Sequence, residues 1–174
     1  MDIQLENLNI NFRNETSTPF FQVENDHRLR FDTDYINRGN LTQIVDLLFQ
    51  DNHNIKLSYS HGKVFPKKIK EPTRIGKYIS IKNWKEEFIE IENEYNDKEI
   101  YAIVTINNIR KAELVNYILY LKNALKNPYM CIYNEYNLLA NSTDVIDIVS
   151  GSTAKINELK SIYKPIVNQF YSEE

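Results

Sequence analysis

Period-two alternation of apolar and polar residues marks the stretches that we expect to be strands. Around Leu29 and Phe31, apolar side chains alternate with charged neighbours, which predicts a half-buried strand. The run IYAIVTINNI is β-branched and apolar on both faces, which predicts a strand in the interior of a sheet. The expected strands are 27–33, 54–60, a brief one at 78–81, 100–109, 129–142 with a turn at 134–137, and 145–150.

Apolar residues at helical spacing predict the helices. A helix over 41–49 has Asn40 or Thr42 as its candidate N-cap. A second helix over 111–125 carries one continuous apolar face. The last helix, near the C-terminus, contains Pro165 and is therefore expected to kink or split there.

The stretch 84–99, WKEEFIEIENEYNDKE, fits both the helical and the strand periodicity of apolar residues. The helical positions i, i+4, i+7 and i+11 are occupied by Trp84, Phe88, Ile91 and Tyr95. Asn83 with Glu86 three residues later resembles a capping box, and acidic residues suit the first turn of a helix. The alternative is a strand, because FIEIENEY alternates briefly. We expect the helix, with its four apolar residues inward.

The mixture of strands and helices lacks regular βαβ alternation, which favours the α+β class. We expect a mostly antiparallel sheet of about five or six strands packed by about three or four helices. The length of 174 residues suits one domain, which we place at 27–174. Residues 1–26 are polar, and we expect a loosely structured N-terminal arm in which only Phe20, Phe21 and Val23 pack.

Composition and charge exclude several kinds of site. The net charge of −3 does not favour a polyanionic partner, and four glycines leave no material for a Gly-rich phosphate loop. The single cysteine, Cys131, excludes an internal disulfide and a Cys-based metal site, and its apolar neighbours indicate a buried residue. We see neither a signal-peptide core nor a stretch of membrane-spanning length, so we expect a cytoplasmic protein without a membrane partner.

Histidines and hydroxyls form no recognisable catalytic set. None of His27, His53 and His61 has a ligand-type partner three or four residues away, which is typical of surface or turn histidines. Ser60 lies beside His61, but the G-x-S-x-G elbow of a nucleophilic serine is missing.

The remaining candidates have simpler structural explanations. The segment SGST at 150–153 reads as a strand-to-helix turn with Ser152 or Thr153 as N-cap. Paired carboxylates serve a hydrolase only when a cleft holds them at a fixed separation. Such pairs are Asp32 with Asp34 and Asp144 with Asp147. We therefore expect a protein that is not an enzyme, with no catalytic residues, no metal and no cofactor.

Basic residues gather directly before the acidic stretch. The segment 63–85 contains Lys63, Lys67, Lys68, Lys70, Arg74, Lys77, Lys82 and Lys85. Its aromatic residues Phe65, Tyr78 and Trp84 can stack on bases, which makes a nucleic-acid-associated accessory protein the alternative function. The negative net charge and the adjacent carboxylates oppose such binding, so we do not expect a nucleic-acid partner.

Seven carboxylates lie between Trp84 and Glu99. A solvated face is the usual explanation of a charge run. The functional explanation is a negative patch that complements a basic partner, such as a nuclease with a phosphate-binding cleft. The candidate contacts are Glu86, Glu87, Glu90, Glu94 and Asp97, with Tyr95 as an aromatic anchor.

Two stretches resemble an uncharacterised bacterial family. Residues 27–59 resemble its strand–helix–strand opening, and 101–166 resemble its strand–helix–hairpin–helix close. The family's hairpin usually carries a Tyr-Asp-Asp-Arg-Gly box. Here the matching place keeps Tyr133 but continues Asn-Glu-Tyr-Asn, so the resemblance implies a fold more than an activity.

The chain as a whole is similar to bacterial toxin-immunity proteins of contact-dependent inhibition and related polymorphic toxin systems. The features that carry this resemblance are small size, an acidic balance, richness in Asn, Ile, Lys and Tyr, and the lack of a catalytic constellation. It implies a cytoplasmic, non-enzymatic protein that binds a cognate toxin domain, with a nuclease as the natural match, and covers its active site.

Overall fold

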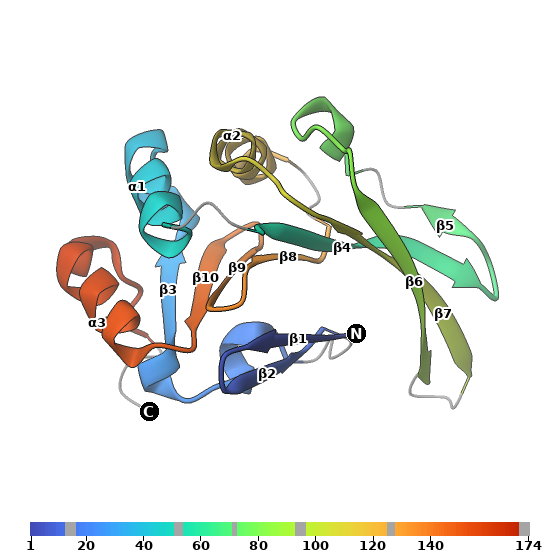
Figure 1. Ribbon diagram of the computed structural model, residues 1–174, viewed down its shortest axis with the longest axis horizontal. Helices are drawn as coiled ribbons and strands as arrows, with labels where there is room; N and C mark the ends of the chain where they lie inside the picture. The colour runs from blue at the N-terminus through green and yellow to red at the C-terminus, as the bar shows by residue number, and fades with distance from the viewer. Residues whose placement is uncertain (13–16, 51–53, 71–72, 93–96, 125–127, 171–174) are drawn as a thin grey trace.

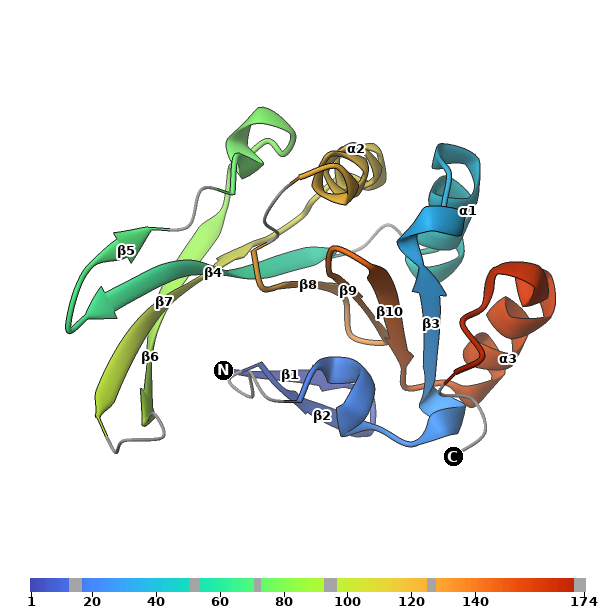
Figure 2. The same cartoon turned by 180° about the vertical axis from the view of Figure 1, so that it is seen from behind.

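The computed structural model describes residues 1–12, 17–50, 54–70, 73–92, 97–124 and 128–170. Their fold is α+β, as the sequence predicts: α-helices pack on one face of a large antiparallel sheet, and a two-stranded hairpin packs on the other (Figure 1). We call these the helix-side face and the hairpin-side face. The same arrangement is seen from behind in Figure 2.

The large sheet has eight strands, more than the five or six expected. They are β3 (Arg28–Asp32), β4 (Lys56–Phe65), β5 (Ile69–Lys70), β6 (Trp84–Glu92), β7 (Lys98–Ile106), β8 (Met130–Tyr133), β9 (Asn137–Asn141) and β10 (Val145–Ser150). Their order is β3-β10-β9-β8-β4-β7-β6, with β5 pairing β4, and the paired strands are antiparallel. Strand β7 lies inside the sheet, which confirms the prediction from its apolar faces.

Three α-helices begin and end close to their predicted positions. They are α1 (Arg38–Leu48), α2 (Lys111–Lys122) and α3 (Thr153–Ile162). The side chain of Asn37, rather than Asn40 or Thr42, caps α1 by accepting from the Asn40 N–H at 2.9 Å. Ser152 caps α3, as expected, and the last segment splits before Pro165.

Short 3₁₀ turns complete the chain. They are η1 (Pro19–Gln22), η2 (Asn25–His27), η3 (Thr33–Tyr35), η4 (Ile75–Lys77) and η5 (Lys164–Ile166). The brief strand expected at 78–81 is wrong, because that segment is the turn that follows η4. The backbone there closes on itself, with the Ile79 N–H donating to the carbonyl of Ile75 at 2.9 Å.

The N-terminal residues differ from the loosely structured arm that we expected. Strands β1 (Asp2–Leu5) and β2 (Leu8–Asn11) form a hairpin, and its alternate residues Ile3, Leu5 and Ile10 are buried. The polar residues that suggested a loose arm are the outward half of this alternation. Packed against the sheet, the hairpin encloses a second core on the hairpin-side face.

Residues 84–92 form strand β6 and not the expected helix. Each residue of β6 pairs with β7, from Trp84 opposite Ile106 to Glu92 opposite Lys98. Pairing with an apolar interior strand satisfies the backbone groups that face β7 over nine residues, and it outweighs a marginal helical periodicity. Trp84 and Phe88, expected inward, are exposed, while Ile89 is buried on the opposite face.

Strand β4 connects the two halves of the sheet. One of its edges pairs with β7 from Leu57 to Phe65; its other edge pairs first with β8 and then, from Gly62 onward, with β5. The register shifts between Ser60 and Gly62, where φ of Gly62 is +127°. We call the part of the sheet beyond this shift the arm: β4 from Gly62 onward, β5, and the parts of β6 and β7 that pair there. It extends away from α1 and α3 (Figures 1 and 2).

A buried ion pair joins β3 to β10 on the hairpin-side face. The guanidinium of Arg30 donates to both carboxylate oxygens of Asp147, at 2.6 and 2.9 Å. Burial raises the pKa of Asp147, and Arg30 opposes that rise. The ring of Phe20 in η1 lies 4.1 Å from the Arg30 guanidinium and 4.5 Å from that of Arg28, so the pair also anchors the N-terminal segment.

Replacing Gly62 with Ala is expected to lower the free energy of unfolding by about 2 kcal/mol or more. A Cβ there would lie 2.0 Å from the Ile69 carbonyl oxygen, and its φ is in the region that favours glycine. Urea unfolding measures the change. Gly76→Ala is the matched control, since its Cβ would meet only the Ile81 side chain at 4.0 Å; an equal loss in both variants would contradict the argument.

Replacing Arg30 with Met leaves the Asp147 carboxyl buried without its partner, and we expect a loss of about 3–5 kcal/mol. Burial raises the pKa of that carboxyl above its unfolded value. The loss is therefore smallest in acid and grows as pH rises above about 4. Urea unfolding at several pH values measures it. The double variant R30M/D147L removes both charges and should regain most of the stability; if it does not, the pairing is not what Arg30 contributes.

Candidate binding surface

The helix-side face of β6 exposes two large aromatic side chains. Because β6 is a strand, its even-numbered residues share a face, and Trp84 and Phe88 lie on it 58% and 63% exposed. The residues beside Phe88 across the sheet are Ala102 and Gly62, which are too small to cover its ring. Phe65 is also exposed on this face of the arm. Clustered exposed aromatic residues mark binding sites in soluble proteins.

Carboxylates alternate with these aromatic residues. Glu86 lies between Trp84 and Phe88 on the same face, and Glu90 follows Phe88. Glu90 accepts from the Lys98 ammonium at 2.8 Å. Burial, and then the carboxylate of Glu86, raise the pKa of Tyr59. This face therefore combines apolar anchors with negative charge.

The predicted acidic contacts do not form one surface. A helix would have turned them all outward, but the strand places Glu87 on the hairpin-side face, away from Glu86 and Glu90. There Glu87 accepts from Lys85 at 2.9 Å. Asp97 is exposed directly before β7. The other two predicted contacts, Glu94 and Tyr95, lie outside the described residues.

The basic segment is also divided. Lys63 forms an ion pair with Glu99 on the hairpin-side face, and Glu99 accepts from the hydroxyl of Tyr101 at 2.8 Å. Lys85 is paired with Glu87, while Lys77 lies at the end of η4. Two of these three charges have carboxylate partners, and nucleic-acid binding by the segment stays an alternative prediction.

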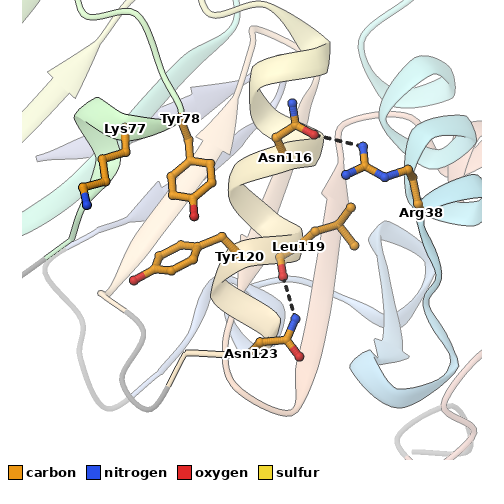
Figure 3. A pocket seen from close by; sticks show the side chains of 7 residues that line it. All are labelled: Arg38, Lys77, Tyr78, Asn116, Leu119, Tyr120 and Asn123. Atoms are coloured by element: carbon orange, nitrogen blue, oxygen red, sulfur yellow. Dashed lines mark hydrogen bonds between the residues drawn. The ribbon is translucent and has the colours of Figure 1, made fainter.

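A hollow of about 500 Å³ lies over α2, between η4 and α1 (Figure 3). Its lining residues are Arg38, Lys77, Tyr78, Asn116, Leu119, Tyr120 and Asn123. The rings of Tyr78 and Tyr120 stack with centroids 4.7 Å apart, and Arg38 donates to the amide oxygen of Asn116 at 2.9 Å. None of these described lining residues is acidic, so the hollow favours anionic groups. Sequence reasoning missed it because its residues come from three distant segments.

Two of the residues weighed for catalysis, His27 and Asp147, have structural roles, and His53 lies outside the described residues. His27 Nδ1 lies 2.7 Å from the carbonyl oxygen of Ser150, and Asp147 is held by Arg30. Cys131 is buried, as predicted, and burial raises the pKa of its thiol. Over the described ranges no three His, Cys, Asp or Glu residues are grouped to hold a metal ion. None of the helices in those ranges has the length and apolarity needed to cross a membrane.

The single tryptophan, Trp84, reports directly on this surface. We expect acrylamide to quench its fluorescence nearly as strongly as in the same chain unfolded in urea, because the residue is 58% exposed. The inward helix expected from the sequence would protect it instead. Weak quenching in the folded protein, relative to the same chain in urea, would contradict the exposed strand.

Comparison with family models, with curated proteins and with solved structures finds no match to this chain. The surface offers exposed aromatic residues interleaved with carboxylates on β6.

Proposed function

We propose that this chain is a non-enzymatic immunity protein, which binds a cognate bacterial toxin domain in the cytoplasm and neutralises it by covering its active site. One observation carries the proposal: Trp84 and Phe88 stand exposed on β6 with Glu86 between them and Glu90 beside them. Tryptophan and other large aromatic residues supply much of the binding energy at protein interfaces.

The charges on this face favour a basic partner. Carboxylates placed around aromatic anchors steer a basic surface toward the site and disfavour acidic surfaces. A nuclease presents such a surface where it binds phosphates, so a protein that covers its active site needs carboxylates of this kind. The aromatic residues then exclude water from the contact, which strengthens the charge pairs at its rim.

Reversing Glu86 and Glu90 together to Lys should slow association with any toxin domain that is encoded beside this gene by about tenfold. The loss should shrink at high salt, since screening weakens the steering field. Surface plasmon resonance measures the rates. Survival of cells that express the toxin measures neutralisation.

The matched control compares the single reversals Glu86→Lys and Glu87→Lys, which make the same change of charge on opposite faces of the same strand. An equal effect of these two single reversals would show that the helix-side face is not the contact. If the unmodified protein neither binds the neighbouring toxin nor protects cells, the immunity role itself is wrong.

A further inference from the structure

The outer edge of β6 presents backbone groups as well as side chains. The Asn107 N–H donates to the carbonyl of Asn83 at 2.9 Å, so residue 83 turns its polar groups toward β7. The alternation of an antiparallel ladder then turns those of Lys85, Glu87 and Ile89 the same way. The even-numbered residues direct their N–H and C=O groups away from β7. These are the residues whose side chains form the exposed helix-side face.

The two edge strands of the sheet, β3 and β6, differ in whether another segment pairs with their outer edge. At one end, Val167 pairs with Phe31 of β3, and the Asn168 N–H donates to the Arg30 carbonyl at 2.9 Å. At the other end, β6 is the last of the ordered strands, and no described segment pairs with its outer edge along its nine residues. An open edge of this length is a template for another strand.

A second copy of the chain does not suit this edge in the register centred on Phe88. Antiparallel pairing of two β6 strands about Phe88 would set Glu86 of one copy opposite Glu90 of the other, twice. Like charges directly opposite each other destabilise a pair of strands. The carboxylates of Glu86 and Glu90 that repel each other in this pairing attract a strand that carries basic side chains.

We propose that β6 binds its partner by strand addition: an extended segment that carries apolar and basic residues in turn at every second position, all on one face, pairs with the outer edge and continues the sheet. Its apolar side chains lie beside Trp84 and Phe88, and its Lys or Arg side chains lie beside Glu86 and Glu90. The identification of that partner as a toxin rests on the proposed function, whereas strand addition rests on the edge itself.

A synthetic peptide tests this without the toxin. The probe is a capped peptide of about nine residues in which valine and lysine take turns at every second position and threonine fills the positions between them. Two N-methylated forms accompany it, one methylated at the odd and one at the even positions. Only one set of N–H groups faces β6, so one form should lose at least about tenfold in affinity while the other binds like the parent peptide. Fluorescence of Trp84 or calorimetry measures binding.

The matching change in the protein is Glu90→Pro compared with Glu90→Ala. Both remove the carboxylate, but only proline removes the outward N–H, and it leaves the bonds to β7 in place. Glu90→Pro should bind the peptide about tenfold more weakly than Glu90→Ala. Circular dichroism and urea unfolding check that both variants fold.

Equal binding of the two methylated peptides, or no binding of the parent peptide at low salt, would overturn strand addition, and neither result depends on how Glu90→Pro folds. Equal binding by folded Glu90→Pro and Glu90→Ala would overturn it as well. Failure of the toxin assay with a positive peptide result would remove only the proposed function. Toxin binding with a negative peptide result would leave that function in place and assign the contact to side chains alone.

Discussion

Backbone pairing along β4 is the constraint on which the rest of this molecule depends. At its start β4 lies between β8 and β7, and from Gly62 onward β5 takes the place of β8. The exchange requires a backbone that bends without a side chain, because the Ile69 carbonyl approaches Gly62 at the shift in register. One half of the sheet is thus packed between helices and the N-terminal hairpin. The other half extends as the arm and exposes β6.

Much of the fold could be predicted from the sequence because local patterns and long-range pairing agree there. The run VIDIVS is a strand by composition, and it lies between β3 and β9, where both faces are buried. The split of the last helix near Pro165 follows from local chemistry alone. These elements needed no knowledge of their neighbours in space.

The acidic stretch shows where this agreement ends. Trp84 and Phe88 are four residues apart, a spacing that fits one face of a helix and also one face of a strand, since four is an even number. Pairing with β7 favours the strand over the helix. The apolar strand β7 follows in the chain and pairs with β6 along the edge that β4 does not occupy. The strand also changes the candidate site. In a strand the side chains repeat every 2 residues and not every 3.6, so Glu87 lies on the face opposite to Glu86 and Glu90. The hollow over α2 had no comparable local signal.

The difference between the two ends of the sheet limits what the molecule can assemble into. Val167 occupies part of the β3 edge, and like charges oppose a second copy at β6. Fibre growth needs two complementary free ends on every subunit so that each addition creates the next site. A sheet that is extended once at β6 offers no such repeat. The proposed strand addition would therefore end in a one-to-one complex and would not propagate.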